Sequence, residues 1–140
     1  MRLFSFEIRW MELWFRSILP LEGDTYLPGA ESLPIDAFIR DFFSHTPVGS
    51  AIGVRLASNL VTVLFFLRYG RRPFRQSRDV RNAWLQRLGD SRVYILRELP
   101  MLLKLTAFMA WDAQHSVHRA LGVTGDLGRP AVWLHKEEQA

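Results

Sequence analysis

Cysteine is absent from the 140-residue chain. Its absence excludes disulfide bonds, thiolate nucleophiles and cysteine-ligated zinc or iron–sulfur sites. The chain also lacks the G-x-S-x-G sequence that marks a serine nucleophile, and residues 122–128, GVTGDLG, are not the G-x-G-x-x-G of a dinucleotide site. We therefore expect no catalytic residue and no cofactor bound by this chain.

Long apolar runs are also missing. The longest, LASNLVTVLFFL at residues 56–67, has 12 residues and lies between Arg55 and Arg68. A membrane-spanning helix needs about 20, so we expect no membrane span and interpret the run as the middle of a buried, central helix. Charged residues recur within the apolar N-terminal segment, which argues against a signal peptide. These observations favour a cytoplasmic protein.

A metal site is not expected either. Asp112, His115 and His118 are spaced three apart, and Asp41 and His45 are four apart. Each group resembles half of a helical metal site, but the Glu-x-x-His motifs of di-iron bundles are absent. We leave open whether the first group has any role.

Arginine dominates the charge that is present. Of 18 basic residues 16 are Arg, and the net charge is +4. Six arginines fall within residues 68–81, RYGRRPFRQSRDVR. Three readings remain: a solvated or internally paired corner, a surface for a protein or phosphate group, and a nucleic-acid surface with steep salt dependence. The preference for Arg over Lys favours an interface, because guanidinium groups bind in a bidentate way or stack.

Apolar residues recur at spacings of three and four, with no convincing strand alternation. We expect an all-α fold of about five helices in one orthogonal or bundle-like domain, residues 1–122, followed by an extended tail, residues 123–140. The helices are expected at about residues 3–19, 34–46, 47–69, 77–89 and 90–121.

Local signals mark several of the helix ends. Gly70 is expected to cap the third helix and Ser77 to begin the fourth. Gly49 and Gly53 favour close approach of another helix, and Pro100 predicts a kink or break. In the fourth helix the predicted core face is Val80, Trp84, Leu85 and Leu88, which leaves Arg78, Arg81 and Arg87 for solvent.

Aromatic side chains exceed what one small helical core usually hides. They include Trp10, Trp14, Phe15, Trp84, Trp111 and Trp133. An aromatic-rich core is one explanation and a binding surface is the other, because Trp and Arg are enriched at binding hot spots. The residues we expect to bind a partner are Trp10, Trp14, Arg71, Arg72, Phe74, Arg75 and Trp133.

The layout between residues 8 and 112 resembles a known family. An amphipathic helix ends in Leu–Pro before a Pro–Gly loop, ILPLEGDTYLPGA, and LRELPMLLKL follows later in the chain. The chain is similar to the small helical subunit of glucose–methanol–choline (GMC) type flavin dehydrogenases, the gluconate 2-dehydrogenase subunit 3 family. It also resembles the helical N-terminal region of long-chain alcohol oxidases. The residues that carry the likeness are Leu19, Pro20, Pro28, Gly29, Phe74, Arg81, Leu85, Leu88, Ser91, Arg97, Leu103 and Lys104.

The resemblance implies a non-catalytic accessory subunit that binds and stabilises a larger flavoprotein oxidoreductase, with FAD in that partner. Exported members of the family often carry a twin-arginine signal and cysteines, and neither is present. A version without them would work in the cytosol or at the inner face of a membrane. A small basic helical protein that binds nucleic acid is the alternative, and an enzyme with a helical pocket for an apolar ligand is a third possibility.

Overall fold

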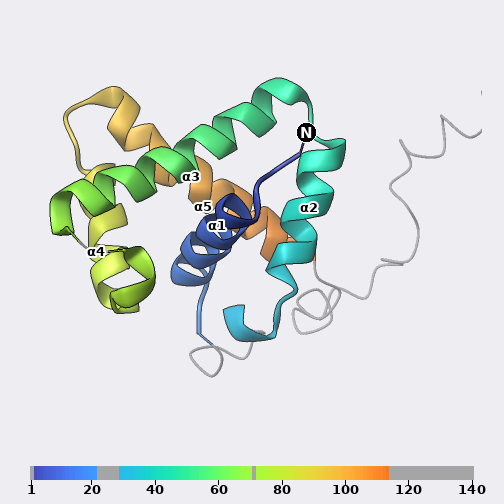
Figure 1. The fold of residues 1–140 in the computed structure, drawn as a ribbon, viewed down its shortest axis with the longest axis horizontal. Coiled ribbons are helices and arrows are strands. Elements are labelled where there is room, and N and C mark those ends of the chain that lie inside the picture. The colour runs from blue at the N-terminus through green and yellow to red at the C-terminus, as the bar shows by residue number, and fades with distance from the viewer. Residues whose placement is uncertain (1, 22–28, 71, 114–140) are drawn as a thin grey trace, which may run out of the picture.

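A computed structural model describes residues 2–21, 29–70 and 72–113 (Figure 1). Within these ranges the secondary structure is helical, which confirms the all-α prediction. The α-helices are α1 (Ser5–Ile18), α2 (Ile35–His45), α3 (Val48–Tyr69), α4 (Arg78–Gly89) and α5 (Tyr94–Asp112). Two short 3-10 turns, η1 (Ala30–Ser32) and η2 (Pro73–Arg75), precede α2 and α4. The predicted continuation of the last helix to Leu121 and the predicted tail lie outside the described residues.

Several helix ends follow local sequence signals. Gly70 ends α3 with a φ of 60°, the left-handed region that glycine adopts without steric cost. The Ser77 hydroxyl accepts a hydrogen bond from the Val80 backbone N–H at 3.4 Å and caps α4. Pro100 does not break α5, which runs through it as one helix with the proline ring buried. The predicted break is therefore wrong.

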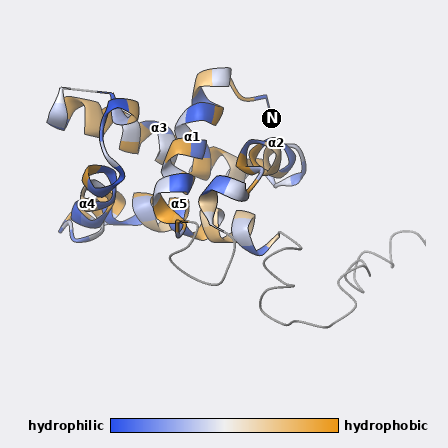
Figure 2. Cartoon of the chain, turned by 90° about the horizontal axis from the view of Figure 1, so that it is seen from below, coloured by the Kyte–Doolittle hydropathy of each residue, from blue (hydrophilic) through white to orange (hydrophobic). Residues whose placement is uncertain are grey.

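Helix α1 is the centre of the fold. It packs against α2, α3, α4 and α5 (Figure 1). Its Met11, Trp14 and Phe15 are fully buried. In Figure 2 the ribbon of α4 is largely hydrophilic, whereas α5 is largely hydrophobic.

The prediction that the third helix is central is wrong. One side of α3 packs on α1 and α5, but its other side exposes apolar residues along the length of the helix. A helix that is apolar on all sides is usually buried on all sides. The sequence does not show whether the same chain or another molecule covers its second side. A Cβ added at Gly49 or Gly53 would meet no heavy atom within 4 Å other than the adjoining residues and backbone of α3 itself. The expected close helix approach is therefore not made by the residues that the structure describes.

An ion pair fixes α3 to α1. Glu7 is 2% exposed, and its carboxylate accepts bonds from Arg55 Nε at 2.6 Å and Arg55 Nη2 at 2.9 Å. The Asn59 side chain and the Phe4 backbone N–H donate to it as well, each at 2.9 Å. Burial acts to raise the pKa of Glu7, but these hydrogen bonds and the charge of Arg55 outweigh it and hold the pKa below its ordinary value.

Candidate functional site

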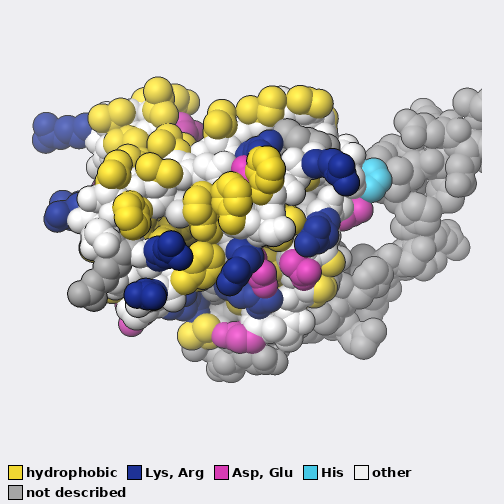
Figure 3. Space-filling view, viewed as in Figure 1, with side chains coloured by type: hydrophobic (Ala, Val, Ile, Leu, Met, Phe, Trp, Pro, Cys, Tyr) yellow, Lys and Arg dark blue, Asp and Glu magenta, His cyan; other side chains and the backbone are white. Residues whose placement is uncertain are grey.

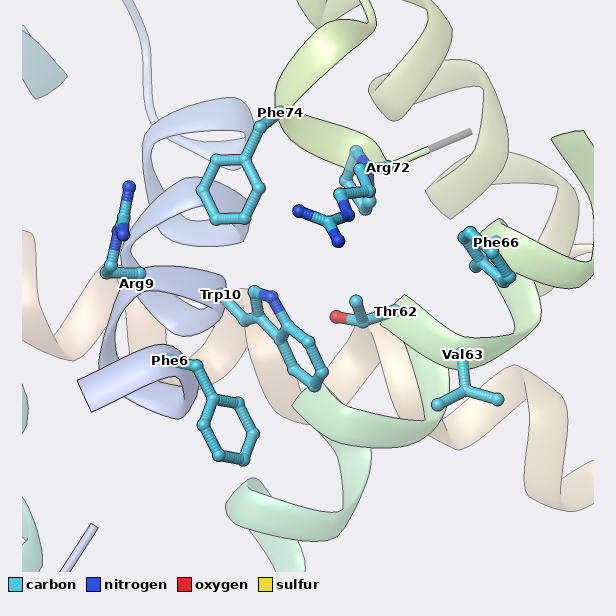
Figure 4. A pocket seen from close by; sticks show the side chains of 9 residues that line it. Phe6, Arg9, Trp10, Thr62, Val63, Phe66, Arg72 and Phe74 are labelled. Atoms are coloured by element: carbon cyan, nitrogen blue, oxygen red, sulfur yellow. The ribbon is translucent and has the colours of Figure 1, made fainter. Parts of the chain in front are cut away.

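An aromatic pocket with two arginines lies between α1, α3 and η2 (Figure 4). Its volume is about 500 Å³, within the range of about 300–1,000 Å³ typical of ligand pockets. Nine residues line it. They are Phe6, Arg9 and Trp10 from α1, Thr62, Val63 and Phe66 from α3, Pro73 and Phe74 from η2, and Arg72 directly before η2.

The walls of the pocket are held by ring contacts. Phe6 and Trp10 meet edge to face with their centroids 5.0 Å apart. Arg9 lies over the Phe74 ring at 5.6 Å from its centroid, which is a cation–π distance. Figure 4 shows the Trp10 indole in the middle of the pocket, with Phe74 of η2 and the preceding Arg72 projecting towards it. The pocket therefore presents flat apolar surface beside two guanidinium groups.

Among the residues that the structure describes, no carboxylate lines this pocket. Arg72 is exposed and also lines a neighbouring hollow with Phe66, Gly70 and Arg75. Guanidinium groups bind carboxylates and phosphates through paired N–H donors. The arrangement suits a group that is both apolar and anionic.

The arginines of residues 68–81, which we call the arginine corner, are of two kinds: some are bound to the chain itself and others are exposed. Arg78 Nε donates to the Ser17 carbonyl oxygen at 3.2 Å, and Arg78 Nη2 donates to the carbonyl oxygen of Leu19. Both acceptors lie at the end of α1, where carbonyl groups have no partner within the helix. Our prediction that Arg78 is left for solvent is therefore wrong.

Arg81 is internally bound too, against the same prediction. Its Nε donates to the Ser17 hydroxyl at 2.6 Å, and its Nη1 donates to the carbonyl oxygens of Gln76 at 2.7 Å and Pro73 at 3.3 Å. Burial, and then the charge of Arg78, lower the pKa of Arg81. By contrast, Arg68, Arg72 and Arg75 are exposed and form no ion pair within the described ranges. Arg87 is exposed on α4, as predicted.

Only some of the expected partner-binding residues lie at the pocket. The structure brings Trp10, Arg72 and Phe74 together in the pocket and places Arg75 beside it. Trp14 does not belong to this surface, because it is fully buried and its Nε1–H donates to Thr62 Oγ1 at 2.9 Å. The core also holds Phe15 and Trp84. Arg71 and Trp133 lie outside the described residues.

Sequence reasoning missed Phe6, Arg9 and Phe66 as site residues. Phe6 and Phe66 are exposed aromatics, but their sequence neighbours do not reveal that they face the same pocket. Within the described residues no cluster of three metal-ligating side chains is present. His115 and His118, which belong to the predicted half-site, lie outside those residues.

The chain matches no model of a known protein family, no curated protein and no solved structure.

Proposed function

We propose that the chain is a non-catalytic accessory subunit that binds a larger protein through the aromatic pocket. The observation that carries the proposal is the meeting of Trp10, Phe74 and Arg72 at one concave site. Trp and Arg are the residue types that most often dominate binding energy, and they act best in pockets that exclude water. The occupant would be a partner segment with an aromatic or aliphatic side chain next to a carboxylate.

The partner we propose is a large flavin-dependent oxidoreductase of the GMC type, which carries the FAD. This finer identification rests on the family resemblance. The complex would work in the cytosol or at the inner face of a membrane.

Two observations favour a protein partner over nucleic acid. Arg78 and Arg81 are tied to carbonyl and hydroxyl oxygens of the chain itself, so the corner offers fewer cations than its sequence suggests. The exposed Arg72 stands among aromatic rings rather than in a row of cations. A backbone-binding surface gains affinity from several phosphate contacts made side by side.

The test is capture of the partner by the tagged full-length chain from the cells that produce it, with mass spectrometry and flavin absorbance of the captured complex. We expect a large flavoprotein in a fixed ratio to the chain. Trp10→Ala and Arg72→Ala should each weaken capture by about thirtyfold, since loss of a hot-spot side chain costs about 2 kcal/mol. The matched control is Arg87→Ala, an exposed arginine outside the pocket.

Two outcomes would contradict the proposal. One is a partner that the pocket variants bind at full strength. The other is a chain that binds DNA or RNA at physiological salt, loses that binding steeply as salt is raised, and captures no protein.

A further inference from the structure

The outer side of α3 carries a continuous apolar surface, which we call the α3 outer face. Its seven exposed side chains follow spacings of three and four along the helix, except that the last two are adjacent, and none is charged. They are Val48, Ile52, Leu56, Leu60, Val63, Phe66 and Leu67, of which Val63 and Phe66 also line the pocket. Figure 3 shows hydrophobic side chains along the right part of the upper edge of the molecule, where the first half of α3 runs in Figure 1. Water-soluble proteins rarely leave an apolar surface of this extent uncovered.

Helix α3 also meets the length and composition of a membrane-crossing helix. It has 22 residues, and less than half of its most apolar window is buried in the protein. The 12-residue run from which we expect no span is shorter than α3, the helix that contains it. The length of α3 is therefore compatible with contact between this helix and lipid.

The other side of the same helix argues against a spanning position. Ala57, Val61 and Phe65 are buried in the core. Arg55 is paired with Glu7 of α1, and Thr62 accepts the bond from Trp14. Lipid cannot surround a helix that is attached to the protein along one side. With a rise of 1.5 Å per residue, about 33 Å of α3 is available to lie along a surface instead.

The sequence segment that carries the α3 outer face has charge of one sign. Residues 42–78 contain no Asp or Glu and six Arg. Of these arginines, Arg68, Arg72 and Arg75 are exposed at the end of α3 and in the corner that follows. The surface that would complement this segment is anionic. A second copy of the same segment offers no carboxylate to these arginines.

A second apolar surface on α5 differs in this respect. Its exposed side chains include Met101, Leu102, Leu105, Phe108 and Met109. Helix α5 carries both signs of charge, with Glu98 and Asp112 as well as Arg97 and Lys104. Charge complementarity therefore favours binding of an anionic surface by the α3 outer face and not by the exposed side of α5.

We propose that the α3 outer face binds the surface of an anionic lipid bilayer. The helix lies parallel to the membrane, its apolar side chains outside the pocket enter the boundary between headgroups and acyl chains, and the exposed Arg68 and Arg75 contact lipid phosphates. This extends the proposed function, because an accessory subunit bound in this way brings its partner to the membrane.

The experiment is co-sedimentation of the full chain with vesicles of phosphatidylcholine mixed with phosphatidylserine, and with vesicles of phosphatidylcholine alone. We expect binding to the mixed vesicles, weaker binding as salt rises, and release by alkaline carbonate. Leu56→Gln combined with Leu67→Gln should lower vesicle affinity by at least about tenfold, because two apolar side chains no longer enter the lipid.

The matched control is Met101→Gln combined with Leu105→Gln on α5. The α3 pair is 61% and 73% exposed and the α5 pair 65% and 62%, so neither double variant should lose the circular dichroism of the folded protein. The control should keep full vesicle affinity. Arg68→Gln, which leaves the apolar surface intact, should weaken binding to the mixed vesicles alone. Since none of these residues lines the pocket, partner capture should be unchanged in all three variants.

Several results would overturn the inference. They are no binding to the mixed vesicles, equal binding to phosphatidylcholine alone, and equal loss in the α3 and α5 variants. Resistance to carbonate would show a span instead. A dimer in solution that Leu56→Gln with Leu67→Gln dissociates, without a change in vesicle binding, would assign the face to a second copy of the chain.

Discussion

Glu7 of α1 and Arg55 of α3 form an ion pair across 48 residues of sequence, with Glu7 Oε1 at 2.6 Å from Arg55 Nε. The carboxylate is almost fully buried, whereas the arginine side chain is 27% exposed. All four donors around Glu7 come from α3 or from the start of α1. The pair therefore fixes how the central helix meets the helix that carries the α3 outer face.

Glu7→Gln should lower the free energy of unfolding by about 2 kcal/mol. Removing one partner of a buried ion pair leaves the other charge partly desolvated and without compensation, and the exposure of Arg55 reduces that cost. Urea denaturation followed by circular dichroism measures it. Glu12→Gln is the control, since Glu12 pairs with Arg16 one turn away at the surface and should change stability by less than about 0.5 kcal/mol. Equal effects of the two variants would contradict the role of the buried pair.

The same carboxylate predicts a pH dependence. The pKa of Glu7 is lowered in the folded protein from 4.5. The stabilisation is thus complete above about pH 4.5, where the carboxyl is ionised in both states, and it is lost as pH falls through the lower folded pKa. The difference in stability between the wild type and Glu7→Gln should shrink over that acid range. A difference that stays constant from neutral pH to the acid transition would show that Glu7 does not titrate as described.

Thr62→Val should destabilise the fold by about 1–3 kcal/mol. Trp14 is fully buried, and its indole N–H donates to Thr62 Oγ1 at 2.9 Å, so the valine leaves a buried donor without an acceptor. Thr106→Val is a matched control: Thr106 is equally buried, and its hydroxyl donates to the Leu102 carbonyl of its own helix. Its effect should stay below about 0.5 kcal/mol. Thermal or urea unfolding measures the loss of unfolding free energy in each variant. Equal losses in the two variants would refute the prediction.

Arg81→Ala should cost about 2–3 kcal/mol of stability, because three hydrogen bonds from one charged group to Ser17, Pro73 and Gln76 are lost. Arg87→Ala on the same helix removes an exposed arginine and should change stability by less than about 0.5 kcal/mol. Urea unfolding is again the measurement. If Arg81→Ala were as stable as Arg87→Ala, the corner would be a solvated one after all.

Local signals predicted the helices, although α5 begins at Tyr94 and not near residue 90. Gly70 and Ser77 mark helix ends because their effect acts within one turn of backbone. The predicted core face of α4 is also confirmed, with Trp84, Leu85 and Leu88 buried and Val80 packed against the core. Each of these inferences depends only on neighbours within a few residues.

The contacts that failed to emerge from the sequence join distant segments. Arg81 and Ser17 are 64 residues apart, and neither has a neighbour that indicates the other. The spacing of apolar residues also cannot separate a core-facing side of α3 from an outward side, because both sides are apolar. For the same reason the pocket was only partly predicted. Trp10, Arg72 and Phe74 were chosen by residue type, whereas Phe6 and Phe66 enter it through tertiary packing.

The end of α1 can complete its hydrogen bonds only after α4 has been synthesised, because its side-chain donors come from α4. The carbonyl groups of Ser17 and Leu19 receive their side-chain donors from Arg78, which is made about 60 residues later. At about 5–20 residues per second a ribosome needs roughly 3–12 s to reach it. During that interval the last turn of α1 lacks these donors, although α3, which carries the Thr62 acceptor of Trp14, has already been made. A nascent chain paused before Arg78 therefore holds α1 with its last turn unfinished, and pausing there should increase aggregation of this protein.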